Sequence, residues 1–444
     1  MNSEQKKATE ALLRFIEKSP TAYQCVDTVS EMLVDAGFTR LSEGEKWTLE
    51  EGRGYFLTRN GSAVLAFRMP RKRGRAFRIA ASHSDSPTFA LKPGYESEIL
   101  GKYMRLSTER YGGTIMSSWL DRPLSVAGRI VVRDGDGFST RSVVLDRDLL
   151  LIPSVAIHMN RTVNEGYQYN PAVDLLPLYG AGDAKGKLRE EVAEAAGVRA
   201  DDIVSSDLYL YSRTKGTVWG ADDAFFSSPR IDNLMCAYGT LRGFLDAEAG
   251  ADDATVSVYA VFDNEETGSA TKQGGGSMLL RDTLTRIADA SGKELSVMLA
   301  SSFMVSADNG HARHPNHPEL SDAQNAPYMN EGVVIKTNVS QKYATDALSA
   351  ALFSEICSRA DVPTQRFTNR SDMLGGSTLG SIADTFTPIL TVDIGMAQLA
   401  MHSSYETAGT ADTDHLVRAM RVFYETEFFV SGDGVCHLST REKR

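Results

Sequence analysis

The alternation of two apolar patterns after Arg230 limits the fold of this chain more than any other feature of its sequence. Segments with apolar residues at helical spacing, such as "RIDNLMCAYGTLRGFL", alternate with short apolar runs such as "TVSVYAVF" and "PILTVDI". The run "AFRIAAS" near the N-terminus follows two further helical patterns. Helices that alternate with buried strands are typical of α/β proteins. We therefore predict a layered α/β/α domain with a largely parallel central sheet.

The pattern changes between about Lys92 and Trp219. In this stretch, apolar and polar residues alternate and are interrupted by Gly and Asp, as in "GRIVVRDGDGFSTRSVVL". Such alternation is typical of antiparallel strands joined by turns. We predict that residues 92–219 form a β-rich domain, inserted into a discontinuous domain made of residues 1–91 and 220–444.

Charge and cysteine usage exclude several functional classes. The chain has 444 residues with 47 basic and 58 acidic side chains, and its net charge of -11 argues against binding to nucleic acid or to anionic membranes. The N-terminal residues form an amphipathic helical pattern without a long apolar core, so we expect a cytoplasmic protein. The four cysteines lie far apart without a CxxC pair, which gives no thiolate metal site.

Carboxylates and histidines collect directly after the apolar runs. Ligands of open α/β sheets bind at the carboxyl ends of the strands, so these positions are candidates for a shared site. Imidazole and carboxylate groups without thiolates are the ligands expected for zinc or a similar divalent ion. The candidates that follow a run or begin the packed helix are His83, Asp85, Asp232, Glu265, Glu266, Asp308 and His402.

Each candidate has an ordinary structural explanation when it is taken alone. An aspartate at a strand end is usually a helix cap or a turn residue, and paired glutamates often begin an exposed helix. The candidates nevertheless share positions at strand ends, which favours a common metal site. His311, His314 and His317 in "HARHPNH" offer a rival metal site, but Pro315 breaks regular helical spacing. We interpret this second group as a loop near the site.

Six segments in order give the chain a resemblance to a known family. It resembles the aspartyl aminopeptidases, family eighteen of the metallopeptidases, nearly from end to end. Ala397 is one departure, because relatives often carry Pro before "QLAMHS". The matching segments are "SHSDSP" (82–87), "RIDNLM" (230–235), "DNEETGS" (263–269), "SADNGHARHPN" (306–316), "SDMLGGSTLG" (371–380) and "QLAMHSSYE" (398–406).

The resemblance implies a centre with two divalent ions. One ion would be held by His83, Asp232 and Asp308. The other would be held by Asp232, Glu266 and His402, so that Asp232 bridges the two ions. Zinc is the expected metal, with cobalt or manganese as alternatives.

The resemblance also assigns roles to four further residues. Asp85 would orient His83 through its second ring nitrogen, and Glu265 would be the general base. His158 would reach the active site of a neighbouring subunit and stabilise the oxyanion. Lys336 would bind the acidic side chain of a substrate whose first residue is Asp or Glu. The expected assembly is a tetrahedral dodecamer built from dimers, in which the β-rich domain mediates the dimer contacts.

Other functions share parts of this chemistry. Carboxypeptidases and amide deacylases use two metals as well, but they need a fixed cation for a substrate carboxylate. An aminopeptidase with a preference for neutral first residues is a closer alternative. A peptide-binding or assembly protein that has lost activity is the most distant one. Glu265 beside all five expected ligands argues against such a loss.

Overall fold

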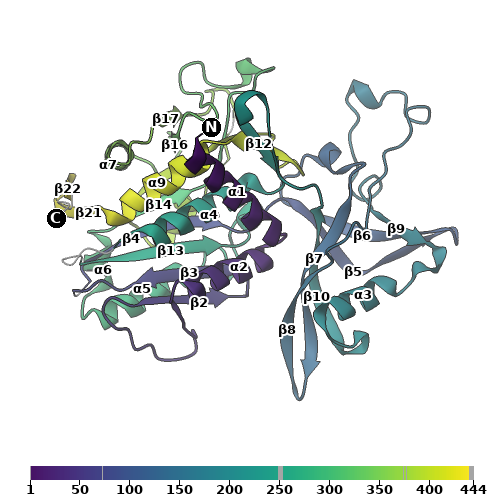
Figure 1. Ribbon diagram of the computed structural model, residues 1–444, viewed down its shortest axis with the longest axis horizontal. Helices are drawn as coiled ribbons and strands as arrows, with labels where there is room; N and C mark the ends of the chain where they lie inside the picture. The colour runs from purple at the N-terminus through teal and green to yellow at the C-terminus, as the bar shows by residue number, and fades with distance from the viewer. Residues whose placement is uncertain (1, 73, 249–253, 374, 377, 440–444) are drawn as a thin grey trace.

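The computed structural model describes residues 2–72, 74–248, 254–373, 375–376 and 378–439 (Figure 1). Leu374 and Ser377, which belong to the "SDMLGGSTLG" segment, lie outside the described residues.

A nine-stranded mixed sheet forms the centre of the larger body of the described chain. Its four middle strands, β13, β4, β14 and β18, are parallel, whereas β3 and β16 join them antiparallel on either side. The carboxyl ends of the four parallel strands therefore lie at one edge of the sheet. The strand order is β1 (Thr39–Arg40), β2 (Gly54–Arg59), β3 (Ala63–Arg68), β13 (Thr255–Phe262), β4 (Ala76–His83), β14 (Phe303–Ala307), β18 (Leu390–Gly395), β16 (Val333–Lys336) and β17 (Thr364–Phe367).

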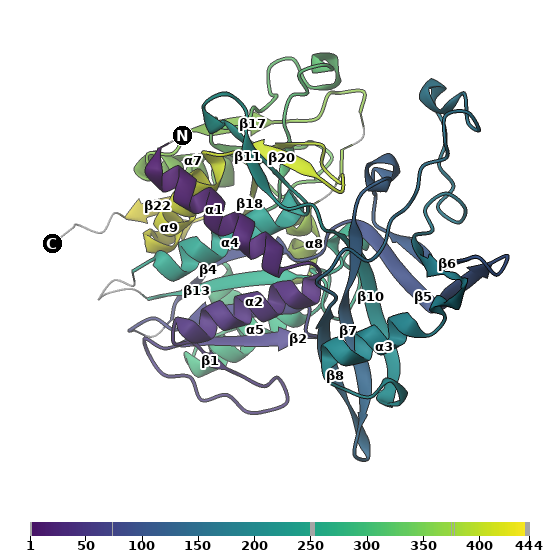
Figure 2. The same ribbon diagram turned by 45° about the vertical axis from the view of Figure 1, so that its right-hand side comes forward.

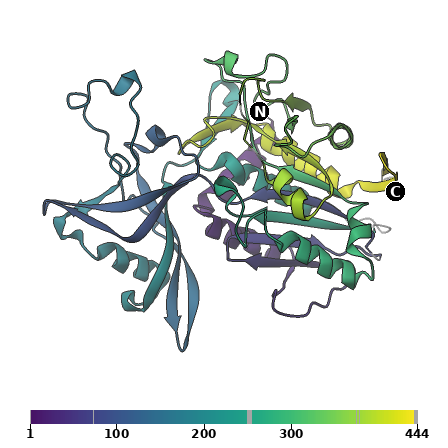
Figure 3. The same cartoon turned by 180° about the vertical axis from the view of Figure 1, so that it is seen from behind.

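Helices cover both faces of this sheet, as Figures 2 and 3 show from two sides. Each face has its own apolar core. The helix α4 (Ile231–Asp246) packs closely on α9 (Asp412–Glu425). A Cβ on Gly243 would lie only 2.5 Å from Cβ of Met420, so glycine allows this close approach. The predicted α/β/α layers are confirmed. One face carries α1 (Ser3–Lys18), α2 (Ala22–Asp35), α4 (Ile231–Asp246), α7 (Ala347–Arg359) and α9 (Asp412–Glu425), and the other carries α5 (Leu279–Ala290), α6 (Leu295–Leu299) and α8 (Leu379–Phe386).

A separate six-stranded antiparallel sheet forms the second lobe (Figure 1). We call the chain from Thr88 to Ser212 the six-stranded module. It has its own apolar core, which includes a helix, α3 (Lys187–Ala196), that the strand pattern did not predict. The strand order is β8 (Gly137–Val144), β7 (Leu124–Asp134), β10 (Ile203–Ser212), β5 (Thr88–Ile99), β6 (Tyr103–Tyr111) and β9 (Leu178–Ala181).

A third sheet of five short strands corrects the predicted position of His402. The apolar run before His402 splits into β18 of the main sheet and β19 of the small sheet, so His402 follows no strand of the main sheet. It lies in the turn between β19 and β20. Most residues of both strands are buried, so the pattern of apolar residues does not mark the division. The order is β11 (Thr217–Trp219), β12 (Phe225–Ser228), β20 (Glu406–Gly409), β19 (Ala397–Leu399) and β15 (Gly310–His311), and a separate hairpin pairs β21 (Glu427–Gly432) with β22 (Val435–Ser439).

Candidate metal centre

Three of the candidate groups meet because their strands are parallel neighbours. His83 is the last residue of β4 and pairs in register with Phe262, the last residue of β13. The chain after β13 forms a short 3-10 helix, η6 (Glu265–Thr267), which therefore begins beside His83. Asp308 directly follows β14, the other neighbour of β4. The sheet alone thus brings an imidazole and carboxylates to one edge.

The remaining two candidates reach this edge from outside the sheet. Asp232 lies in the first turn of α4, where its backbone is not helical (φ −80°, ψ 108°). His402 has φ 69°, in the left-handed region that residues other than glycine rarely adopt. A left-handed backbone at a residue other than glycine costs free energy and persists only where the surrounding structure enforces it. Residues of this kind are often found at functional sites.

Four separations between imidazole nitrogen and carboxylate oxygen describe the site. His83 Nε2 lies 3.6 Å from Asp232 Oδ1 and 3.5 Å from Asp308 Oδ1. His402 Nε2 lies 3.5 Å from Asp232 Oδ2 and 3.4 Å from Glu266 Oε2. These separations are longer than ordinary N–H···O hydrogen bonds. They match the edges of a tetrahedron around zinc, which are roughly 3.3–3.6 Å for the usual zinc–ligand bond lengths.

The Asp232 carboxylate faces both histidines with different oxygens. Oδ1 points to the His83 side and Oδ2 to the His402 side, while the side chain is only 4% exposed. Oδ1 is buried and has no hydrogen-bond partner among the described residues. A buried charged oxygen without a partner is costly unless a cation compensates it. The donor set therefore fits divalent ions of the zinc type, and His83, Asp232 and Glu266 form a group whose ligand atoms lie within 4.8 Å of one another.

Asp85 connects His83 to the paired glutamates. His83 Nδ1 lies 3.2 Å from Asp85 Oδ1 and 3.1 Å from the Asp85 carbonyl oxygen. The two carboxylate oxygens of Asp85 also accept the backbone N–H groups of Glu265 and Glu266, both at 3.2 Å. One buried carboxylate thus orients the imidazole and fixes the backbone of both glutamates.

Glu265 lies beside this cluster, and its environment favours proton transfer. Burial raises the pKa of its carboxyl group to about 7, with an opposing contribution from His83 and a further increase from Asp308. A carboxyl group with a pKa near neutrality can both accept and return a proton. Its carboxylate makes no hydrogen bond with the part of the chain that the structure describes.

Lys336 is placed against a predicted metal ligand. Its Nζ lies 3.6 Å from Asp308 Oδ2 and donates a hydrogen bond of 2.8 Å to the carbonyl oxygen of Asn309. The residue is 2% exposed. Burial alone would raise the pKa of Asp308, but Lys336 and His83 hold it well below its usual range.

The histidines of "HARHPNH" do not form a second cluster in the described structure. His311 belongs to β15, where it is exposed. His314 and His317 lie on an exposed segment with their ring centroids 5.3 Å apart, and His317 Nδ1 lies 3.2 Å from Glu319.

His158 lies away from the cluster within its own chain. It belongs to an exposed segment of the six-stranded module and forms no hydrogen bond or ion pair with any described residue of the site. Three neighbouring apolar residues are also exposed: Val155 (50%), Ile157 (49%) and Met159 (82%).

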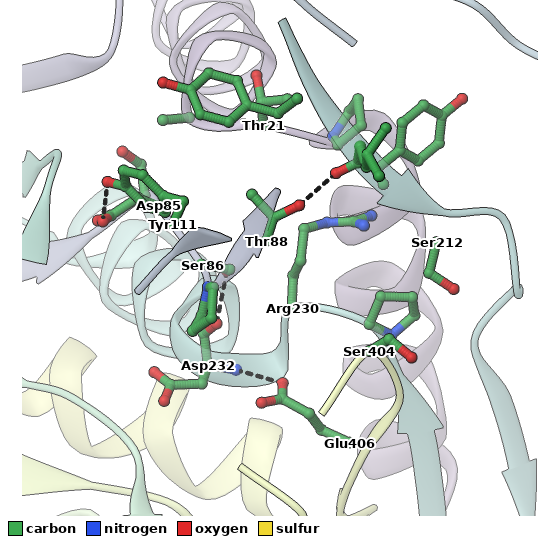
Figure 4. Close-up of a pocket in the computed structure, with 18 of the residues that line it drawn as sticks. Thr21, Asp85, Ser86, Thr88, Tyr111, Ser212, Arg230, Asp232, Ser404 and Glu406 are labelled. Carbon is green, nitrogen blue, oxygen red and sulfur yellow. Dashed lines mark hydrogen bonds between the residues drawn. The ribbon is translucent and has the colours of Figure 1, made fainter. Parts of the chain in front are cut away.

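Three supporting groups were not predicted from the sequence. Glu406 is fully buried and accepts the backbone N–H of Asp232 at 3.0 Å (Figure 4). It also accepts the backbone N–H of His402 at 2.7 Å. Burial raises the pKa of Glu406 to about 8. Tyr111 and the carbonyl of Gly113, both from the six-stranded module, contact Asp85 and His402 respectively. Of the three, only Glu406 lies within one of the six segments that resemble the family, "QLAMHSSYE" (398–406).

A family model described as aminopeptidase I zinc metalloprotease (M18) matches residues 15–424. The chain belongs to the M18 family of zinc aminopeptidases. The resemblance identified from the six segments is thereby confirmed. In the described residues no helix is both long and apolar enough to cross a membrane.

Individual M18 relatives match over almost the whole chain. The "Probable M18 family aminopeptidase 2" of Clostridium acetobutylicum is 42% identical over 426 residues, which cover 93% of this chain and 97% of that protein. A chain in the cryo-EM structure of the Ape4 and Nbr1 complex is 34% identical with a TM-score of 0.92, and the match covers 95% of this chain and 86% of that one. The S. cerevisiae mApe1 dodecamer is 27% identical with a TM-score of 0.84, covering 95% and 97%.

Proposed function

We propose that this M18 protein removes the first residue of peptides by two-metal hydrolysis, with a preference for Asp or Glu in that position. The observation that carries the proposal is the set of four imidazole–carboxylate separations of 3.4–3.6 Å around Asp232. His83, Asp232 and Asp308 would hold one ion. Asp232, Glu266 and His402 would hold the other. Zinc is the metal named for the family, and cobalt or manganese would suit the same oxygen and nitrogen ligands.

Bound ions of this kind polarise the scissile carbonyl and make a hydroxide-like nucleophile available near neutral pH. Glu265 accepts the proton of the attacking water and returns it to the leaving amine. Its burial supports this role, because burial raises the pKa of the Glu265 carboxyl group above its ordinary value. The surrounding carboxylates attract the free amino group of the substrate, which restricts cleavage to the first residue.

Lys336 supplies the preference for an acidic first residue. It is the last residue of β16 and the cation that lies beside Asp308, so it carries positive charge at the rim of the metal cluster. A lysine buried in this way remains charged because Asp308 compensates for its loss of hydration, and the pKa of Lys336 is raised. A substrate carboxylate near this ammonium group would gain a charge-assisted hydrogen bond.

The protein assembles from dimers into a tetrahedral dodecamer, and the six-stranded module forms the dimer contact. The mApe1 relative is described as a dodecamer. The exposed apolar side chains around His158 support a contact of this kind, because contiguous exposed apolar residues usually mark an interface. In such a dimer His158 stabilises the oxyanion in the active site of the neighbouring subunit.

The experiment that tests the function combines metal analysis with a panel of substrates. Zinc per subunit is measured on the purified protein, and kcat/KM is measured for free and amino-blocked peptides that begin with Asp, Glu, Leu or Ala. Two zinc ions per subunit and cleavage of free Asp and Glu peptides are expected. Cleavage of amino-blocked peptides would indicate a deacylase or carboxypeptidase instead, and full metal content without any hydrolysis would indicate a binding protein.

A further inference from the structure

A segment of the six-stranded module enters the metal cluster within the same chain. It begins at Tyr111, the last residue of β6, and continues through Gly112 and Gly113. The segment is fixed beside the His402 turn, because the backbone N–H of Ile115 donates to the carbonyl of His402 at 3.0 Å. The Oγ of Ser118 also accepts the backbone N–H of Ser404 at 2.9 Å. The module therefore contacts the site through backbone that is itself hydrogen-bonded.

Tyr111 holds Asp85, the carboxylate that orients His83. The Tyr111 hydroxyl donates to Asp85 Oδ2 at 2.6 Å (Figure 4). It also accepts a hydrogen bond of 2.9 Å from Asn264 Nδ2. Asn264 immediately precedes η6, so the same hydroxyl also connects to the paired glutamates. A short hydrogen bond from a hydroxyl to a carboxylate is stronger than one between neutral groups. Without it, Asp85 Oδ2 keeps only the longer hydrogen bond of 3.2 Å from the backbone N–H of Glu266.

Gly113 orients the other histidine through its carbonyl oxygen, which lies 3.0 Å from His402 Nδ1. A carbonyl can only accept, so Nδ1 carries the proton and the lone pair of Nε2 faces Asp232 and Glu266. A Cβ on Gly113 would lie 3.4 Å from Nδ1, and one on Gly112 would lie 3.1 Å from Cβ of Glu266. Glycine at both positions lets the backbone approach this closely.

We propose that the segment Tyr111–Gly113 of the six-stranded module positions both histidines of the metal centre within its own subunit. Tyr111 acts on His83 through Asp85, and the Gly113 carbonyl acts directly on His402. This inference rests on the proposed metal ligands. It gives the module a role in each separate chain, in addition to any contact between subunits. The expected loss is about 10- to 100-fold in metal affinity at the histidine that each group orients.

Zinc affinity in variants that keep only one histidine tests the assignment. His402→Ala retains the His83 side of the site, and adding Tyr111→Phe there should weaken zinc binding by about 10- to 100-fold. Tyr209→Phe is the matched control, because its ring packs edge-on against Tyr111 at 5.7 Å in the same module and its hydroxyl has no hydrogen bond with the described site residues. In the converse His83→Ala protein, Tyr111→Phe should have a much smaller effect.

The same design applies to Gly113. In the His83→Ala protein, Gly113→Ala should weaken zinc binding. Gly137→Ala, at the first residue of β8 with its nearest new contact at 3.7 Å, should not. Absorption spectra of the Co²⁺-substituted single variants provide a second readout, since they report ligand geometry independently of activity. Changed spectra are expected for Tyr111→Phe and Gly113→Ala but not for their controls.

The outcomes separate this inference from the proposed function. If the wild type binds no metal, the proposed centre is wrong and the inference falls with it. If the wild type binds metal but Tyr111→Phe matches Tyr209→Phe in affinity and spectrum, only the inference is overturned. An equal loss from Tyr111→Phe in the His402→Ala and His83→Ala proteins would show a general structural role and would also overturn it.

Discussion

Lys336 Nζ lies 3.6 Å from Asp308 Oδ2, so the proposed specificity residue and a proposed metal ligand form one buried ion pair. The lysine also donates to the carbonyl of Asn309 and lies 5.5 Å from the ring centroid of Tyr343. Lys336 can therefore act on the substrate directly, or on metal binding through Asp308. These two roles have different consequences for kinetics.

We expect Lys336→Ala to lower kcat/KM for Asp and Glu substrates relative to Leu and Ala substrates. A charge-assisted hydrogen bond is worth roughly 1.5–3 kcal/mol, which corresponds to about a ten- to hundredfold change in selectivity. The measurement is kcat/KM for the four substrates in wild type and variant, with zinc content as the control. An equal decrease for all four substrates together with lost zinc would assign Lys336 to Asp308 instead of to the substrate.

Glu265→Gln should retain both metals and lose turnover. The amide cannot accept the proton of the attacking water, and general acid–base catalysis is typically worth about 10²- to 10⁴-fold in rate. Glu266→Gln is the matched comparison on the neighbouring residue, and it should lower metal content because it replaces a ligand. The measurement is kcat together with zinc per subunit. Turnover near the wild-type rate in Glu265→Gln would remove Glu265 from the mechanism.

Asp232→Ala should lower the content of both ions, whereas Asp308→Ala should affect mainly one. The reason is that Asp232 presents a different oxygen to each histidine, while Asp308 approaches only His83. Zinc per subunit after extensive dialysis measures the difference. Equal zinc content in the two variants would contradict the bridging role of Asp232.

The parts of the site that follow from parallel strands could be predicted from the sequence. His83, Glu266 and Asp308 each follow a short buried run, and the common direction of β4, β13 and β14 brings their ends together. To predict Asp232, one also had to recognise that a helix begins at the same edge of the sheet. The individual roles came from the family resemblance, because residue type alone does not distinguish a ligand from a general base.

The parts that depend on contacts between distant segments could not be predicted. The Gly113–His402 hydrogen bond joins residues 289 positions apart, and neither residue carries a local signal of the other. Tyr111 ends an ordinary strand of alternating residues. The helix α3 was missed because it lies within a stretch dominated by strand patterns. For Tyr111 and Gly113, long-range packing that a single sequence does not encode locally determines the structure, whereas α3 carries a helical pattern of its own.

His158→Ala should lower kcat without lowering metal content, because His158 lies outside the metal cluster of its own chain. Mixed assemblies of His158→Ala and Glu265→Gln subunits should regain part of the activity, since one subunit provides the general base and another the histidine. Activity is measured on mixed oligomers that have been verified by mass. No recovery in such oligomers would contradict an action across the interface.

The stability of the protein should respond to pH through Asp384, which lies on α8 away from the metal ligands. Burial raises the pKa of this carboxyl group from its ordinary value of 3.8 to about 7, although Thr391 donates a hydrogen bond to it. The folded protein therefore holds a proton that the unfolded chain releases. The stability that this proton contributes is fully present below pH 3.8 and is lost as the pH rises to about 7.

Asp384→Asn should remove this dependence, because its amide keeps an oxygen for Thr391 and does not ionise. The difference in Tm between Asp384→Asn and wild type should rise as the pH increases from about 5 to about 8. Measuring both proteins at each pH cancels the titration of groups that do not interact with Asp384. Asp361→Asn, on the exposed turn after α7, is the surface control for the same change of side chain. A constant difference between Asp384→Asn and wild type across this range would show that Asp384 ionises equally in the folded and unfolded states.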